Sequence, residues 1–198
     1  MKLSTVLGSS ILGASLLLAG GCNKQADNTM NYKAAINDYY QAHPACLWSQ
    51  PKKLPVQAAT SDDAKTQGYD ALTDAGLLAR TTGEKKVLII ASKQVNNYDV
   101  SEKGRSAWTA DPTQPGYGNF CYGHRDVTSI DNVTNGADSS GNKTAQESYH
   151  YKIGDAAAWA NTPEMKTAFP DLATVLSGPQ ADNASLTMTG DHWQLVKQ

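Results

Sequence analysis

The sequence predicts an α+β fold, in which an N-terminal helix and a helix-and-hairpin unit precede an antiparallel sheet covered by short helices. Three observations predict this class. Apolar residues recur at helical spacing between positions 29 and 42. Apolar and polar residues alternate over 148–153, as they do in a half-buried strand. A second alternating segment, 184–195, is interrupted by Gly190-Asp191, which is typical of a tight hairpin turn.

The first residues have the three parts of a cleavable export signal. Lys2 lies near the start, an apolar run covers 6–18, and small residues fill 19–21. The apolar run is short and contains Gly and Ser, whereas a helix that spans a bilayer needs roughly 20 mostly apolar residues. The sequence therefore predicts that Met1–Gly21 is removed after export and is not a permanent transmembrane helix.

The end of this segment carries a second signal, Leu18-Ala19-Gly20-Gly21-Cys22. It resembles the lipobox of bacterial lipoproteins, although the commonest form has Leu where this chain has Ala19. The resemblance implies that Cys22 is the first mature residue and carries the acyl chains, so that the lipid bilayer is one partner of the protein. Several acyl chains give stable anchoring, because each buried methylene contributes about 0.8 kcal/mol and a single chain holds only marginally.

The residue after the acylated cysteine bears on the destination. In enterobacterial lipoproteins an Asp at this position tends to retain the protein in the inner membrane, and here the residue is Asn23. The resemblance therefore favours the outer membrane, on the periplasmic face, over the inner membrane or the cell surface. Residues 22–28 form a short lipidated tether, which reaches on the order of 20 Å when extended, so the folded part is expected close to the membrane.

The charge balance excludes one class of partner. The chain has 17 Lys and Arg residues against 19 Asp and Glu residues, and removal of the signal takes Lys2 from the basic side. Proteins that bind nucleic acid normally carry a clustered basic face. We therefore expect no nucleic-acid partner.

With Cys22 acylated, only Cys46 and Cys121 remain, and the periplasm is oxidising. We expect a disulfide between them. A metal or nucleophile site and two free thiols are the alternatives, because Cys121-Tyr122-Gly123-His124 has ligand-like spacing. The four ligands of a structural zinc site are not visible in the sequence, and no metal or other cofactor is predicted.

Two helices are expected in the first part of the mature chain. The first covers about 29–42 with Asn28 or Thr29 as its cap, and His43-Pro44 ends it. The second covers about 62–75 and stops at Gly76. After it, the sequence predicts an extended segment from Leu77, a buried strand over 87–91, and a short helix capped by Ser101 that ends near Trp108.

Residues 62–108 resemble a winged-helix domain in the order of two runs, 72–78 and 98–104, which match its late helix and wing. The resemblance implies a helical, winged-helix-like unit over 29–110. It does not imply DNA binding, because the helix that enters a major groove in that family carries Asp62, Asp63, Asp70 and Asp74 here against Lys65. Winged helices also serve as protein-interaction modules.

The second half is expected to form an antiparallel α+β unit over 111–198, either as a separate unit or as one compact domain with 29–110. Prolines and glycines over 111–123 predict a linker or rigid loop. Strands are expected over about 120–133 and 148–153. A short Ala-rich helix and a helix that begins at Thr162-Pro163 follow them.

No catalytic, cofactor-binding or metal-binding constellation is predicted. Ser49-Gln50-Pro51-Lys52 fits the Ser-x-x-Lys pattern of serine enzymes, but Pro51 lies where that mechanism needs a regular helical turn. The chain has four histidines, and none lies in a recognised catalytic or metal-binding pattern: His43, His124, His150 and His192.

Two functions remain. The first is a membrane-anchored, non-enzymatic protein-interaction module of the bacterial envelope, such as an assembly factor, a regulator or an inhibitor, with another envelope protein as its partner. The alternative is an enzyme or small-ligand receptor for cell-wall fragments, in which a loop over 116–124 lines a pocket. That alternative requires His124 or His150 beside an acid or a hydroxyl in a concave site.

Overall fold

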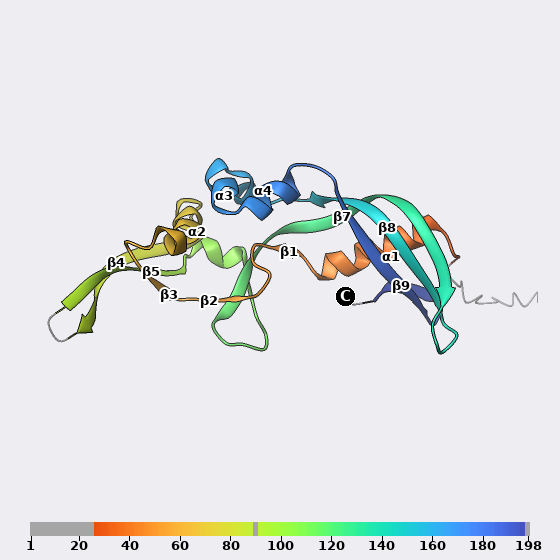
Figure 1. Ribbon diagram of the computed structural model, residues 1–198, viewed down its shortest axis with the longest axis horizontal. Coiled ribbons are helices and arrows are strands. Elements are labelled where there is room, and N and C mark those ends of the chain that lie inside the picture. The colour runs from red at the N-terminus through yellow and green to blue at the C-terminus, as the bar shows by residue number, and fades with distance from the viewer. Residues whose placement is uncertain (1–25, 89–90, 197–198) are drawn as a thin grey trace, which may run out of the picture.

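The computed structural model describes residues 26–88 and 91–196. These residues form an elongated arch of antiparallel strands with a few helices (Figure 1). Ten strands are present in this described part: β1 (Ala45–Cys46), β2 (Lys52–Lys53), β3 (Val56–Ala59), β4 (Leu78–Leu88), β5 (Ala91–Val100), β6 (Trp108–Ala110), β7 (Tyr117–Ala137), β8 (Lys143–Gly154), β9 (Gln180–Thr189) and β10 (His192–Leu195). The helices are α1 (Thr29–Ala42), α2 (Asp63–Asp74), α3 (Pro163–Ala168) and α4 (Pro170–Leu176), with 3-10 turns at Lys103–Ser106 and Ala158–Asn161.

The larger sheet is organised along β7, which is 21 residues long. Its first part pairs with the short strands β1, β2 and β6, and its second part pairs with β8, followed by β9 and β10. This second part curls as a half-barrel, and α1 lies in its hollow (Figure 1). The buried side chains between them include Tyr32, Ile36, Tyr149, Leu186 and Trp193.

The smaller sheet has the order β3-β5-β4, with every pair antiparallel. A second buried cluster joins this sheet and α2 to the first part of β7 and to α3 and α4. Its fully buried members include Leu72, Tyr98, Phe120 and Met165. The short helices α3 and α4 therefore pack in one cluster with α2, although they follow it by about a hundred residues in the chain.

The predicted α+β class with a winged-helix-like unit is wrong. The described chain is mostly antiparallel β-structure, and its first helix, α1, packs against the curled sheet of the C-terminal strands. The helix α2 instead packs against α3, which lies about a hundred residues later in the chain. Residues 62–108 do contain a helix followed by a hairpin. Their packing partners come from distant parts of the chain, and these differ from the neighbours that a winged-helix unit would have.

Two further expectations need correction. The linker predicted over 111–123 covers only a turn, because β7 begins at Tyr117. The glycines in this stretch serve close packing: a Cβ at Gly118 would lie 2.5 Å from the Trp108 ring, and one at Gly123 would lie 2.7 Å from the Gly154 carbonyl oxygen. The curled part of the sheet is also not covered by a set of short helices, since α1 fills its hollow and α4 adds only Val175 at the edge of that cluster.

Several local predictions are confirmed. The helix 29–42 begins at Thr29 with Asn28 as its cap, and the Asn28 side chain accepts a hydrogen bond from the Asn31 amide at 2.9 Å. The helix α2 ends just before Gly76, which has a φ of +77°. The Thr162 side chain caps α3, as expected from Thr162-Pro163.

The disulfide between Cys46 and Cys121 is present and joins the paired strands β1 and β7. It closes a loop of 75 positions along the chain. The segment 1–21, Cys22 and part of the predicted strand 87–91 lie outside the described residues. Within the described ranges no helix is long and apolar enough to cross a membrane.

Candidate functional site

Two adjoining cavities form an aromatic groove on the described surface. The first, of about 360 Å³, lies between β3, α2 and the α3–α4 junction. The second, of about 260 Å³, continues towards α4. Three residues line both cavities: Trp48, Ala168 and Phe169. With Tyr69 on the wall of the first cavity, the aromatic groove presents three large rings that are only partly buried.

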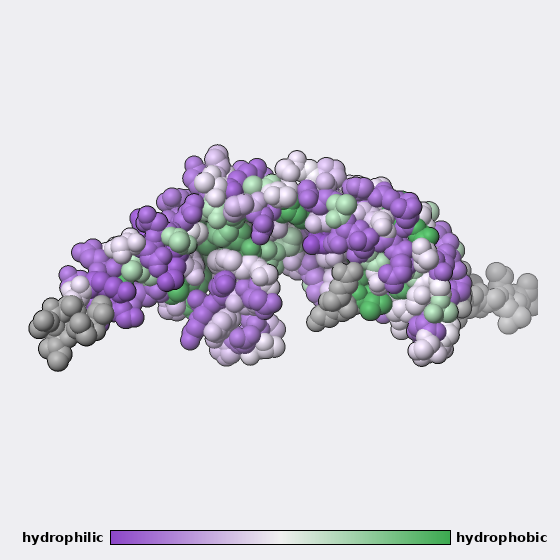
Figure 2. All heavy atoms as spheres, viewed as in Figure 1, coloured by the Kyte–Doolittle hydropathy of each residue, from purple (hydrophilic) through white to green (hydrophobic). Residues whose placement is uncertain are grey.

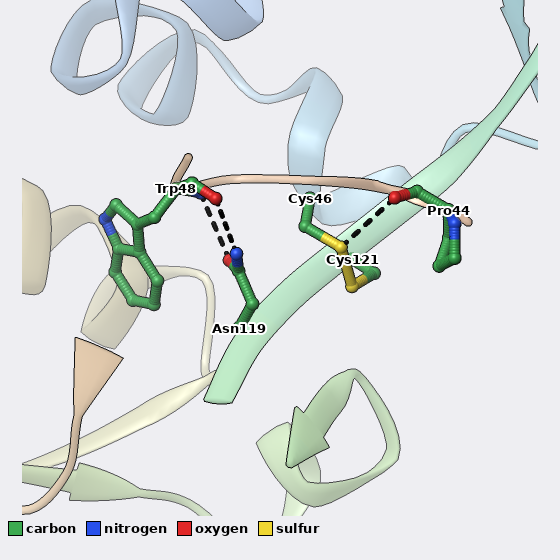
Figure 3. Close-up of a disulfide and its surroundings, with 5 residues drawn as sticks. All are labelled: Pro44, Cys46, Trp48, Asn119 and Cys121. Carbon is green, nitrogen blue, oxygen red and sulfur yellow. Dashed lines mark hydrogen bonds between the residues drawn. A yellow bond between two sulfur atoms is a disulfide. The ribbon is translucent and has the colours of Figure 1, made fainter. Parts of the chain in front are cut away.

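Trp48 is held in place by its backbone. Asn119 on β7 accepts a hydrogen bond from the Trp48 amide at 3.1 Å and donates one to the Trp48 carbonyl oxygen at 2.6 Å. One residue earlier the Leu47 amide donates to the Phe120 carbonyl oxygen, and the disulfide fixes Cys46 to β7 (Figure 3). The backbone of Trp48 is thus fixed, and its indole packs at a tilt against Phe120, with ring centroids 5.9 Å apart; a fixed backbone lowers the entropic cost of binding a ligand.

Phe169 also lines the groove, at the junction where α3 ends and α4 begins. Its ring lies directly on α2 at Gly68, and a Cβ at Gly68 would lie 3.1 Å from the ring. A glycine inside a helix costs about 1 kcal/mol relative to alanine. Here it provides the space in which the Phe169 ring packs against the helix.

Below Tyr69, a polar network ties α2 to the small sheet. Tyr69 stacks at a tilt on Tyr98, with ring centroids 5.1 Å apart, and the Tyr98 hydroxyl donates to the Asp70 carboxylate at 2.8 Å. The same carboxylate oxygen accepts a charge-assisted bond from Arg80 at 2.6 Å. The Tyr69 hydroxyl is neutral at physiological pH, and burial raises its pKa further above the ordinary value of 10.0. Tyr69 therefore gives the groove an uncharged aromatic wall.

Charges lie at the ends of the groove. Lys52 lines the second cavity together with Asp171, and Lys65 lines the first. Lys65 pairs with Asp62 at 2.8 Å, and their hydrogen bond lowers the pKa of Asp62. On the other side of α2, a cavity of about 560 Å³ is lined by acidic residues: Asp63, Asp70, Asp74 and Glu164.

The histidines that the alternative function needs do not come together in a cavity. His150 lies beside the Asp131 carboxylate at 2.7 Å, but both side chains are more than a third exposed on the sheet surface. His43 contacts the Tyr39 carbonyl oxygen at 2.8 Å at the end of α1. The predicted loop over 116–124 is mostly the strand β7, with His124 on it. No group of three or more His, Cys, Asp or Glu side chains suited to a metal ion occurs among the residues described.

Arg125 forms the most connected polar cluster of the curled sheet. Its guanidinium lies over the Tyr40 and Tyr151 rings, at 4.8 and 4.4 Å from their centroids. It also pairs with Asp182 at 2.7 Å and donates to the Tyr40 hydroxyl at 3.1 Å. These contacts join α1, β7, β8 and β9, so Arg125 holds the helix α1 against the sheet.

The sequence did not identify the aromatic groove. No local pattern singles out Trp48 or Phe169, because their meeting depends on two segments that are 121 positions apart. One local signal was present: Phe169 precedes Pro170, which is typical of a junction between two helices.

Figure 2 shows a mostly hydrophilic outer surface, with apolar residues reaching the surface chiefly beneath the arch. Comparisons of the chain with protein-family models, with curated proteins and with solved structures found no match.

Proposed function

We propose that the protein is a lipid-anchored module of the bacterial envelope that binds a partner protein through the aromatic groove. The observation that carries the proposal is the partly exposed side chain of Trp48, whose backbone is fixed by Asn119, in a groove that Phe169 also lines. Rigid aromatic anchors beside a cavity are the residues that dominate binding energy at protein interfaces. The acylated Cys22 of the proposal holds the protein at the membrane.

The groove supports a protein ligand better than a reaction. Its lining combines aromatic and aliphatic side chains with one or two charges at each end. Ser49 and Lys52 both line the second cavity, but residues 49 and 50 form a bend and not the helical turn that the Ser-x-x-Lys mechanism needs. The enzyme alternative required a histidine beside an acid in a concave site, and the His150–Asp131 pair lies on an exposed strand surface instead.

Photo-crosslinking in intact cells tests the proposal. A photoreactive phenylalanine analogue is placed at Gln67, an exposed position that lines the groove, and in a separate variant at Ser139, an exposed position in the β7–β8 turn. We expect one discrete adduct from position 67 and none from position 139. Trp48→Ala abolishes this adduct, and Trp48→Phe retains it because an aromatic ring still fills the site.

The role of the anchor is tested in the same cells. Cys22→Ser removes the proposed acylation site, and we expect the adduct at position 67 to be lost or strongly reduced because the protein no longer concentrates at the membrane. Equal adducts from positions 67 and 139, or an adduct that is indifferent to Trp48→Ala in a folded protein, would overturn the proposal that the groove binds the partner.

A further inference from the structure

The strand β3 forms one edge of the small sheet. It pairs only with β5 among the described strands, in the register Val56↔Tyr98 to Ala59↔Val95. The Thr60 amide donates to the Gln94 carbonyl oxygen at 3.1 Å. This bond shows that the backbone groups of Thr60 point to β5. Because alternate residues of an antiparallel strand face the same neighbour, Gln57 and Ala59 direct their backbone groups to the outer edge.

These outward groups are largely unused. The Ala59 carbonyl oxygen accepts from the Asp62 amide at 3.1 Å. The N–H and C=O of Gln57 and the N–H of Ala59 remain for a further strand. A free edge of this kind is a template for pairing with another chain.

The aromatic groove runs along this same edge. Its first cavity touches three consecutive residues of β3, Val56 to Ala58. Since neighbouring side chains on a strand point to opposite faces, the contact with all three residues means that the cavity reaches the backbone of β3. A chain added to β3 would place a side chain in this cavity, which Trp48 and Phe169 also line.

Charge at one end of β3 indicates what that chain carries. Lys52 and Lys53 precede β3 on the exposed strand β2, and Lys52 lines the groove. Neither lysine is in any of the salt bridges formed within the described ranges, which join other residues. Against these two ammonium groups the second cavity sets one carboxylate, Asp171, so the balance there is positive and complements an acidic segment.

We propose that the partner's contribution to the groove is an extended acidic peptide segment that adds as a strand to the outer edge of β3, with an apolar side chain between Trp48 and Phe169 and a carboxylate at Lys52 and Lys53. This inference rests on the proposed function and names the form of its ligand. Strand addition derives its affinity from main-chain hydrogen bonds and its specificity from side-chain pockets, and β3 with the groove offers both.

The test uses the mature protein and nine-residue peptides selected on it from a random displayed library. We expect the selected peptides to share one large apolar residue and an excess of Asp and Glu. Lys52→Glu combined with Lys53→Glu weakens their binding about five- to tenfold. The matched charge reversal Lys85→Glu with Lys86→Glu, on the exposed part of β4, leaves binding unchanged.

Amide hydrogen exchange supplies the decisive readout. On binding a selected peptide, the amides of Gln57 and Ala59 become protected at least tenfold, whereas those of Val56 and Ala58, already bonded to β5, change little. Alternate N-methylation of the peptide backbone abolishes both the binding and this protection. Binding without protection at Gln57 and Ala59 overturns strand addition, as does concentration-dependent protection in the protein alone, which would identify a second copy as the occupant.

The two proposals can fail separately. If the adduct at Gln67 in cells depends on Trp48 while the Gln57 and Ala59 amides stay unprotected in the complex, the groove binds the partner but not as a strand. If no adduct forms at Gln67, the proposed function itself is wrong. If peptides without acidic residues bind equally well to the wild type and to the Lys52→Glu, Lys53→Glu variant, the assigned chemistry is wrong.

Discussion

Glu147 is the least typical residue of the core between α1 and the curled sheet. It follows the inward alternation of Ala145 and Tyr149 on β8, is only 3% exposed, and neither of its carboxylate oxygens accepts a hydrogen bond within the described chain. Burial raises the pKa of Glu147 from the ordinary 4.5 to about 7. The folded protein therefore favours the protonated acid.

This shift predicts how stability depends on pH. The folded-state pKa lies above the unfolded-state value, so the free energy of unfolding falls as the pH rises from about 4.5 to about 7 and then levels off. At high pH the ionised Glu147 carboxylate lowers the free energy of unfolding by about 3 kcal/mol. We expect Glu147→Gln to be more stable than the wild type at pH 8 and similar at pH 4, as measured by urea unfolding at both values.

The exposed Glu164 provides the matched control for this change. Glu164→Gln should leave the difference between the two pH values unaltered, because this carboxyl group lies on the surface. A Glu147→Gln variant with the wild-type pH profile would show that the buried carboxylate has a partner in solution.

Gly68 gives a second prediction at the scale of a residue. Gly68→Leu forces the Phe169 ring away from α2, because even a Cβ at this position lies 3.1 Å from the ring. We expect a loss of about 1–3 kcal/mol in the free energy of unfolding and a several-fold lower yield of the adduct at position 67. Gln67→Ala, at the neighbouring exposed position, should change the free energy of unfolding by less than about 0.5 kcal/mol. If Gln67→Ala lowered the free energy of unfolding as much as Gly68→Leu, the packing role of Gly68 would be contradicted.

At the scale of elements, the segment from Cys46 to Trp48 depends on β7 for its position. The disulfide, the Leu47–Phe120 hydrogen bond and the Asn119 amide hold it against this strand. The segment itself has little regular structure, since β1 has two residues. Its order therefore comes from tertiary contacts and not from local propensity.

Replacement of both bridging cysteines tests this dependence. Cys46→Ser with Cys121→Ser should lower the free energy of unfolding by about 4 kcal/mol, because the 75-position loop is no longer closed in the unfolded state. Urea unfolding with and without a reductant measures the effect. The reductant should bring the wild type to the level of the variant and leave the variant unchanged; a variant as stable as the oxidised wild type would contradict the prediction.

Elements also show where sequence reasoning succeeds. The starts and stops of α1, α2 and α3 follow from caps and a glycine close by in the sequence, at Asn28, Gly76 and Thr162. The linker predicted over 111–123 is wrong from Tyr117 onwards, because Gly118 and Gly123 lie within the strand β7 and not in turns. Glycine is needed at these two positions because the backbone closely approaches Trp108 and the Gly154 carbonyl group, which lie on other strands.

At the scale of the whole molecule, the proposed acyl anchor and the arch set the working position of the groove. The described chain begins at Ala26, close after Cys22, and continues into α1 in the hollow of the curled sheet. The aromatic groove lies in the other part of the arch, beside the small sheet (Figure 1). In the proposed function, one end of the arch provides the attachment and the other the binding.

The anchor gives a prediction at this scale. We expect the wild type to fractionate with the outer membrane of an enterobacterial host and Cys22→Ser to appear in the soluble periplasmic fraction. Asn23→Asp should move the acylated protein to the inner membrane, because it introduces the residue associated with retention. Immunoblots of separated membranes measure both changes. Retention of Cys22→Ser in the membrane fraction would contradict the lipid anchor.

The proposed division of the chain at 110 and 111 stays a prediction. The two buried clusters are each built from distant parts of the sequence: one unites α1 with strands after residue 127, and the other unites α2 with α3 and α4. The sequence contains the apolar stripe of α1 and the alternation of β8, but neither pattern states which partner covers it.

What the sequence determined by itself are features with local causes: helix caps, the hairpin of β9 and β10, the pairing of the two remaining cysteines and the expectation of an anchor at Cys22. Only the tertiary structure decided that α1 fills a curled sheet, that β7 is one long strand, and that Trp48 faces Phe169 across 121 positions of chain. The physical reason is that apolar burial is non-directional. An apolar stripe on a helix or strand must be buried against another apolar surface. Which distant surface covers it depends on the packing of the whole chain.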